Sequence, residues 1–505
     1  MDFLDPDFKR RRNQRLMLGY VLTATMIFLI AGILVYAAYG FNLDRKTGEV
    51  VHNGLLYVDS APDKAKVELK GVGSDIKLDA QTNTKVTVPD GEYNIKISKN
   101  GYRDWNRKMD ILGGTVYRVT YPLLIMSDLK QNKIADFGVT KPAFTTSSPD
   151  RRWIVKADNT LPLVINVFDL KSVDKSQKVP KNTQLTLPNI IKPADGTEVF
   201  EVVEWSTDNK NFLVKHNYGS GVEFLVINRE QPLESVNLND LSGLKPTNVS
   251  LDDKDAEKWY FYSDKDLTLT QVNNKKETSL IKERVTTYTS HGSDTLVYAQ
   301  KISDTEQKVY LRKDNQERLI GSYKPGRIGL KITEFDGDWF LAVSSGGDGK
   351  TYIYKNPQKV IRSVANSTGV NPINAIGFAD SLANPTFSAN SRFILVNNDK
   401  KFGVFDAEKV EIYTYNIDDT INLQNFKPKW MDGHRIMYLT SHNMIKIVDF
   451  DNNNKQTLVK SDDVDHVFFD RDYTVMYTVL SSPATESSLA SNILNYTDLR
   501  LDNDK

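Results

Sequence analysis

One strand–turn–strand pattern recurs through most of the 505-residue chain, and it restricts the fold more than any other feature. Its clearest copy, residues 203–214, reads VEWSTDNKNFLV: an aromatic lead-in, a polar turn and an apolar run with high β propensity. The same order of residue types returns in seven further segments: 143–155, 249–262, 288–299, 332–343, 387–396, 430–439 and 468–479. Each copy contributes one turn residue that can be aligned: Asp150, Asp208, Asp253, Asp294, Asp336, Asn390, Asp432 and Asp470.

The spacing of these copies indicates a β-propeller. Successive turn residues lie 58, 45, 41, 42, 54, 42 and 38 positions apart. Repeats of about 40–50 residues that carry the signal of four strands are typical of propeller blades. The count predicts eight blades, or seven if the third copy, whose turn is longer than the others, is spurious. The predicted propeller spans residues 127–505.

A propeller must also close its ring, because an unpaired sheet edge invites aggregation. The eighth unit has only one further strand candidate, NILNYTDLRL at 492–501. Residues 130–139, KQNKIADFGV, form a strand candidate that has no place in the first blade. We therefore predict that this segment supplies the outer strand of the last blade.

The N-terminus predicts a single membrane span. A basic cluster (Lys9, Arg10, Arg11, Arg12 and Arg15) precedes residues 16–43, which carry no charge. That run exceeds the roughly 20 apolar residues that a helix needs to cross a bilayer. The positive-inside rule then predicts a cytoplasmic tail at 1–15, a transmembrane helix at 16–41 and an extracytoplasmic remainder. The alternative is a cleaved secretory signal ending near Ala37, although the apolar run is longer than such signals usually have.

Between the span and the propeller, the sequence predicts a spacer at 42–53 and a small all-β domain at 54–126. Short runs rich in β-branched and aromatic residues alternate there with Gly, Pro, Asp and Asn. These runs predict a sandwich of five or six strands: LLYVDS, KVELKG, KVTV, YNIKISK and TVYRVTYPLLI.

Two of these segments carry a family resemblance. Residues 60–71 read SAPDKAKVELKG, and residues 89–97, PDGEYNIKI, follow with Gly101 and Tyr102 behind them. This two-part pattern resembles the PEGA domain, although Asp63 stands for Glu and Lys64 for Gly in the name-giving positions. The resemblance implies a bacterial, extracytoplasmic sandwich that serves as a spacer or adhesion module, without catalytic residues. A Lys at position 64 matters if that position needs a positive φ.

The propeller repeat has a resemblance of its own. Trp205, Ser206 and Asp208 form an aromatic-Ser-x-Asp motif that is similar to the blades of TolB-like and other WD-repeat-like bacterial propellers. Such motifs specify architecture and carry little information about activity.

Composition removes several classes of function. Lys plus Arg and Asp plus Glu are equal at 65 each, so the chain has no electrostatic footprint for nucleic acid. It contains no cysteine, which excludes disulfides, thiolate catalysis, cysteine-bound zinc and iron–sulfur clusters. The span has no Gly-x-x-x-Gly pair that would indicate helix dimerisation. The oligomeric state stays open.

Two segments resemble ligand loops in part. Residues 344–351, SSGGDGKT, end like a phosphate-binding loop, but the next residues predict a strand instead of the required helix. Residues 449–455, DFDNNNK, suggest a calcium loop, but Asn454 and Lys460 stand where that loop needs Gly and Glu. Both are interpreted as hairpin turns, and a loose surface calcium site at the second stays as the alternative.

The remaining candidates are isolated in the sequence. Ser220 does not lie in the Gly-x-Ser-x-Gly form of a nucleophile elbow, because Tyr218 and Val222 stand where that form needs glycine. The acid pairs Asp252-Asp253 and Asp462-Asp463 would suit acid–base chemistry, but such pairs are equally expected in solvated turns. Trp105 is interpreted as a core residue, with a binding platform as the alternative. Six histidines lie far apart and are expected to be isolated: His52, His216, His291, His434, His442 and His466. We assign no catalytic, cofactor-binding or metal-binding residue, and the binding residues stay unknown.

Two long excursions, residues 171–199 and 363–386, interrupt the blade rhythm and are the places to look for a partner surface. The sequence favours a single-pass cell-membrane protein that displays a sandwich and a propeller outside the cytoplasm. It would bind or scaffold, recognising a protein, peptide or envelope glycan through its propeller. The alternative is an extracytoplasmic hydrolase or lyase built on the propeller, although no catalytic motif supports an enzyme.

Overall fold

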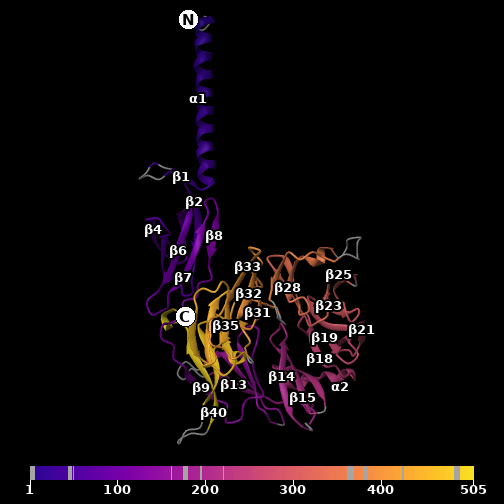
Figure 1. Ribbon diagram of the computed structural model, residues 1–505. Coiled ribbons are helices and arrows are strands. Elements are labelled where there is room, and N and C mark those ends of the chain that lie inside the picture. Colours follow the sequence, from indigo (N-terminus) through magenta and orange to yellow (C-terminus); the bar gives the residue numbers. More distant parts are fainter. Residues whose placement is uncertain are drawn as a thin grey trace. The chain divides into compact units, whose positions relative to one another are not determined.

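The computed structural model (Figure 1) describes residues 6–43, 48, 50–160, 162–173, 180–193, 196–219, 221–314, 316–360, 369–378, 385–423, 426–482 and 490–504. The chain divides into two compact units. The first comprises Met1–Asp128 together with Arg500–Lys505, and the second comprises Leu129–Leu499.

The first unit begins with the helix α1, Pro6–Ala38 (Figure 1). Its side chains from Lys9 onward are exposed, and it is long and apolar enough to cross a membrane. The sequence prediction of an apolar N-terminal helix is confirmed. Length and composition alone do not separate an anchor from a signal sequence.

Strand β1, Phe41–Leu43, follows the helix directly and pairs with β2, Val50–Val58. The ring of Phe41 stacks on His52 with centroids 4.2 Å apart, and the His52 ring bonds to the Tyr39 carbonyl. Parts of the expected spacer at 42–53 are therefore strands of the sandwich. Residues 44–47 and 49 of this spacer lie outside the described residues.

Where the structure describes the first unit, its strands form two four-stranded sheets. One has the order β1-β2-β5, with β8 pairing in parallel on β2, and the other has the order β4-β3-β6-β7. The remaining strands are β3 (Lys66–Gly71), β4 (Lys77–Gln81), β5 (Thr84–Pro89), β6 (Gly91–Ser98), β7 (Trp105–Ile111) and β8 (Val116–Val119). The sequence prediction of five or six strands missed β1, β4 and β7. The last two are polar edge strands that leave much of their length exposed.

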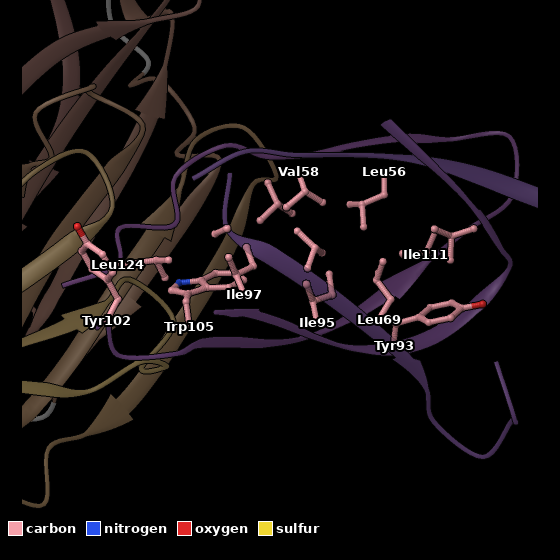
Figure 2. Close-up of a cluster of buried hydrophobic side chains, with 14 residues drawn as sticks. Leu56, Val58, Leu69, Tyr93, Ile95, Ile97, Tyr102, Trp105, Ile111 and Leu124 are labelled. Carbon is pink, nitrogen blue, oxygen red and sulfur yellow. The ribbon is translucent and has the colours of Figure 1, made fainter. Parts of the chain in front are cut away.

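The sandwich core lies between the two sheets (Figure 2). Trp105 is 1% exposed and sits among Ile95, Ile97 and Leu124, so it is a core residue and not a binding platform. Figure 2 shows Tyr102 at one end of this cluster, with its hydroxyl directed away from the core.

Among the described residues of the second unit there are eight four-stranded sheets, which are the blades of a propeller. Blade 1 consists of β10 (Phe144–Ser147), β11 (Trp153–Ala157), β12 (Ile165–Val173) and β13 (Pro180–Leu185), and blade 2 consists of β14 (Glu198–Trp205), β15 (Asn211–Tyr218), β16 (Val222–Asn228) and β17 (Val236–Asn237). Blade 3 consists of β18 (Asn248–Asp252), β19 (Asp255–Ser263), β20 (Thr268–Asn273) and β21 (Thr278–Lys282), and blade 4 consists of β22 (Val285–His291), β23 (Thr295–Lys301), β24 (Gln307–Lys313) and β25 (Gln316–Tyr323). The short helix α2, Leu238–Ser242, follows β17.

Blades 5 to 8 continue the same order. Blade 5 consists of β26 (Ile328–Phe335), β27 (Asp338–Ser345), β28 (Lys350–Lys355) and β29 (Asn374–Gly377), and blade 6 consists of β30 (Thr386–Phe387), β31 (Phe393–Asn398), β32 (Lys401–Asp406) and β33 (Glu411–Asn416). Blade 7 consists of β34 (Lys429–Trp430), β35 (Arg435–Leu439), β36 (Met444–Asp449) and β37 (Gln456–Lys460), and blade 8 consists of β38 (Val467–Phe469), β39 (Val475–Ser482), β40 (Ser491–Asp498) and β9 (Asn132–Asp136). The repeat in the sequence is thus the hairpin made by the first two strands of each blade. Its third copy is the hairpin β18–β19, so the described blades number eight and not seven.

The predicted ring closure is confirmed. Strand β9 pairs with β40, with Ala135 opposite Leu494, and the two lie side by side in Figure 1. Beyond the strand, the Phe137 amide donates to the Asn492 carbonyl at 2.7 Å. The first strand of the propeller segment therefore completes the last blade.

The recurrent turn has a common geometry, which explains its residue types. In the second blade, Ser206 Oγ donates to the Asp208 carboxylate and accepts from the Asn211 amide at 3.1 Å. Asn209 adopts φ +61°, a conformation that Asn tolerates better than most residues. The same serine bond and the same positive φ recur in the first and sixth blades, at Ser148 with Arg151 and at Ser388 with Ser391.

Candidate functional site: the axial channel

The first strand of each blade lies next to the axis of the propeller. Contacts between blades run from β10 to β14, from β14 to β18, from β22 to β26, from β26 to β30 and from β30 to β34. The first strands of blades 2 to 5 line an open cavity of about 850 Å³, together with their turns and with Lys215 of β15 and Tyr262 of β19. This volume is within the range of small-molecule and cofactor sites.

Hydroxyl side chains dominate the wall of this first cavity. Strand β22 contributes half of them: its sequence VTTYTSH buries only Val285 fully, because the other side chains face the channel or the neighbouring strands. A hydroxyl both donates and accepts hydrogen bonds, so this wall suits a polar ligand. The hydroxyl residues are Thr207, Thr247, Ser250, Tyr262, Thr286, Thr287, Tyr288, Thr289, Ser290 and Thr333.

Three charged side chains from three blades meet in the cavity. Glu204 accepts from the Leu251 amide at 2.6 Å and from Lys254 Nζ at 3.0 Å. Lys331 is exposed on the cavity side but enclosed by the neighbouring blades. This enclosure lowers the pKa of Lys331, repulsion from Lys254 lowers it further, and Glu204 opposes the shift. No ion pair of Lys331 is found within the described residues.

Aromatic side chains fix the remaining wall. Tyr288 bonds to Ser250 at 2.9 Å, and burial raises the pKa of its phenol. His291 meets the edge of Trp339 with centroids 4.8 Å apart, and burial lowers the pKa of this histidine. These groups are therefore neutral near pH 7. The charged side chains of the lining are the Lys254–Glu204 pair and, besides it, Lys331, Lys215, Asp253 and Asp264.

A second cavity of about 870 Å³ lies against the first strands of blades 1, 2, 7 and 8. It shares Val203 and Glu204 with the first cavity. Its lining includes more aromatic residues, among them Phe144, Trp205 and Trp430. It also includes Lys429, which pairs with Asp465, and His466, whose pKa burial lowers.

The structure brings together one cluster that the sequence analysis missed. His216 was expected to be isolated, yet its two ring nitrogens face Glu223 at 2.8 Å and Glu198 at 3.1 Å. The imidazole stacks on Phe200 with centroids 4.1 Å apart, and His216 and Glu223 are fully buried. The signal was available, because His216 and Glu223 flank the β15–β16 turn and are cross-strand partners.

The two suspected ligand loops are hairpin turns. Residues 344–351 join β27 to β28, where Ser345 pairs with Lys350 across the strands, so no helix follows to bind phosphate. Residues 449–455 join β36 to β37, and Asn454 donates to the Asp449 carboxylate at 2.8 Å. Among the described residues, no three His, Asp or Glu side chains form a group suited to a metal ion.

The other candidates are separated. Asp252 is buried and accepts from Gln271 at 2.7 Å, and burial raises its pKa. Asp462 accepts from the amide and the hydroxyl of Ser481, and Asp463 caps the turn of 3-10 helix Val464–His466. Ser220 and large parts of the excursions 171–199 and 363–386 lie outside the described residues.

The fold and the channel define a class of protein: an apolar N-terminal helix, a small β-sandwich, and a propeller with a polar axis. The PEGA domain family matches residues 53–125, so the sandwich is a PEGA domain. Among curated proteins, none matches this sequence.

Several solved structures are similar to the chain. They include the Dos1 propeller (11% identity, 74% of this chain, 95% of that chain, TM-score 0.46). Sqt1 of Saccharomyces cerevisiae also matches (8% identity, 74% of this chain, 100% of that chain, TM-score 0.43). A third is an oligogalacturonate lyase in complex with manganese (9% identity, 75% of this chain, 100% of that chain, TM-score 0.39).

Proposed function

We propose that this protein is a membrane-anchored binding protein of the bacterial cell envelope, and that the axial channel of its propeller binds a polar ligand with an anionic group. The observation that carries the proposal is Lys331, an enclosed ammonium with no ion-pair partner among the described residues, in a wall of hydroxyl groups. An ammonium inside a cavity, where the effective dielectric constant is lower than in bulk water, gains more from a ligand carboxylate than a lysine on the open surface does.

The neighbouring groups support this role. Lys254 is already held by Glu204 at 3.0 Å. Lys331 and Lys215 are the other lysines of the lining, and Lys331 is the more exposed of the two. The surrounding hydroxyls are suited to the alternating donors and acceptors of a glycan or a peptide. The ligand classes expected from the sequence, a protein segment, a peptide or an envelope glycan, all present such groups.

The anchor rests on α1 and on the basic residues before its apolar part. We propose that the helix is retained, with residues 1–15 in the cytoplasm and the propeller outside. The resemblance of the blades to TolB-like bacterial propellers agrees with this location. Mass spectrometry of the full chain purified from bacterial membranes tests retention: an intact N-terminus supports the anchor, and a new N-terminus near residue 37 contradicts it.

A lyase or hydrolase in the same channel is the second candidate. One observation favours it: the pKa of Lys331 is lowered, and a lysine with a lowered pKa is better suited to act as a general base than an ordinary lysine. The two candidates differ in the fate of the ligand, which an enzyme changes and a binding protein releases unchanged.

The experiment uses the full chain in lipid nanodiscs and soluble peptidoglycan fragments with free carboxylates. We expect calorimetric titration to show binding, and the Lys331→Met variant to bind at least about tenfold more weakly. The control variant Lys181→Met alters an exposed lysine on β13 and leaves the affinity unchanged. Amidated fragments, which lack the charge, bind as weakly as Lys331→Met does.

Two results would contradict the binding proposal. Equal affinity of the wild-type chain and Lys331→Met for the fragments excludes Lys331 as the anion contact. Cleavage of the fragments, detected by mass spectrometry after incubation with wild-type chain but not with Lys331→Met, shows the enzyme instead.

A further inference from the structure

The last residues of the chain pack on the PEGA domain. Strand β40 ends at Asp498, and residues from Arg500 onward belong to the same compact unit as the sandwich. Asp504 receives Lys99 Nζ on one carboxylate oxygen at 2.5 Å and the Tyr102 hydroxyl on the other at 2.8 Å. A third bond runs from the Leu501 amide to the Tyr102 hydroxyl at 2.8 Å.

The sandwich presents these groups from a rigid base. The ring of Tyr102 is 6% exposed and belongs to the hydrophobic core, so its hydroxyl is held at a fixed point of the surface (Figure 2). Lys99 Nζ is also held, because it donates to the Asp63 carbonyl at 2.9 Å. Gly101 between them has φ +82°, and a Cβ there would come within 3.2 Å of Leu501 Cδ1.

The electrostatics favour a carboxylate at this position. Burial alone would raise the pKa of Asp504, but the bonds from Lys99 and Tyr102 outweigh it and lower the pKa. Burial raises the pKa of Tyr102 to about 12, so the phenol stays protonated and able to donate at neutral pH. An ammonium and a phenol therefore face the two oxygens of one carboxylate.

The bound segment itself is short and held mainly through polar contacts. Leu501 is 38% exposed, and the 3-10 helix Asp502–Asp504 contains no buried residue. Segments with few buried apolar contacts open at the low end of the stability range. The site is built on core-anchored groups, whereas its occupant has few buried apolar contacts to oppose its release.

We propose that Lys99, Tyr102 and the turn at Gly101 form an acidic-peptide-binding site of the PEGA domain, and that residues 500–504 are its resident ligand. A peptide segment of a partner that presents a backbone N–H and, three residues later, a carboxylate copies the Leu501 amide and the Asp504 side chain. Such a segment competes with residues 500–504 for the site. The site is separate from the axial channel, and the inference does not depend on the function proposed for the propeller.

The test uses the full chain in nanodiscs and an acetylated, fluorescent peptide of sequence RLDNDK, which copies residues 500–505. The wild-type chain is expected to bind it poorly, because its own tail occupies the site. A chain that ends at Leu499 is expected to bind the peptide at least tenfold more tightly by fluorescence anisotropy. Asp504→Asn in the full chain weakens the resident tail and gives an intermediate affinity, which keeps the test valid if the shortened chain fails to fold.

Matched variants locate the contact. In the chain that ends at Leu499, Lys99→Met and Tyr102→Phe each lower peptide affinity at least tenfold, whereas Lys70→Met, an exposed lysine on β3 of the same sandwich, leaves it unchanged. A peptide with Asn in place of its final Asp should bind the chain that ends at Leu499 about as weakly as the original peptide binds the Lys99→Met variant of that chain. The proposal is overturned if neither the shortened chain nor Asp504→Asn gains affinity, or if Lys99→Met binds the peptide normally.

Discussion

His216 Nδ1 lies 2.8 Å from Glu223 Oε1, and neither side chain is exposed to solvent. The same glutamate accepts from the Lys192 amide at 2.9 Å and from Asn237 at 2.6 Å. Lys192 belongs to the excursion 171–199 between blades 1 and 2, so one buried carboxylate joins the hairpin of blade 2 to the end of that excursion. The cluster is a structural clamp that also fixes a candidate partner surface.

Removing Glu223 should therefore destabilise the propeller. The Glu223→Ala variant leaves His216, Asn237 and an amide without their buried acceptor, and the loss of one partner of such a network costs about 3–5 kcal/mol. Urea denaturation of the full chain, followed by tryptophan fluorescence, measures the free energy of unfolding. Glu201→Gln on β14 is the control and should change that free energy by less than about 0.5 kcal/mol, because Glu201 is exposed. Equal values for both variants would contradict the clamp.

Ring closure predicts that a single residue outside the repeat controls the stability of the last blade. Phe137 follows β9 and packs with Ile154 and Phe168 of blade 1 and Leu494 of blade 8. Phe137→Ala should lower the free energy of unfolding by about 3–5 kcal/mol. The neighbouring variant Val139→Ala should have little effect, because Val139 is 61% exposed.

Deletion of residues 128–139 removes the closing strand itself and should sharply lower the melting temperature. An unchanged melting temperature of the deletion chain would show that β9 does not close the ring.

The sequence contained enough information for the repeat, the blade count and the closing strand, because each depends on a pattern of apolar runs and polar turns. The sequence did not reveal strands in which polar residues interrupt the alternation of apolar and polar positions. Edge strand β4 has the sequence KLDAQ, which carries no clear strand signal.

The channel was missed for a related reason. The inner strands face an aqueous cavity, so hydroxyl residues replace the hydrophobic alternation that marks a strand. Lys331 precedes the fifth copy of the repeat by one residue, but nothing in the sequence shows that Lys254 and Glu204 lie near it. Such convergence depends on how the blades are arranged around the axis, and that arrangement is a property of the folded ring.

The departure from the PEGA pattern at Lys64 predicts a stabilising substitution. Lys64 stands at a glycine position and adopts φ +56°, a left-handed conformation that costs an L-residue roughly 1–2 kcal/mol. Lys64→Gly removes this cost but raises the conformational entropy of the unfolded chain. The free energy of unfolding should therefore increase by about 0.5–1 kcal/mol. Lys64→Ala keeps the Cβ atom and should give no gain. Thermal unfolding of the two variants of the full chain distinguishes strain at the backbone from an effect of the lysine side chain.

The lowered pKa of Lys331 predicts its reactivity. A lowered pKa means that a larger share of the amine is neutral, and hence nucleophilic, at any pH below the usual value of 10.5. The pH profile of acylation at Lys331, followed by mass spectrometry, should therefore be displaced to lower pH relative to the same lysine in the urea-unfolded chain. The position of the profile is the readout, because enclosure slows the absolute rate.

Two variants should move that profile in opposite directions. Lys254→Met removes a repelling charge and frees Glu204, so the pKa of Lys331 rises and the profile shifts to higher pH. Glu204→Gln removes the attracting charge, so the pKa falls further and the profile shifts to lower pH. Profiles that coincide in both variants would show that Lys331 does not interact with Lys254 and Glu204 across the channel, and would remove the basis for an anion site there.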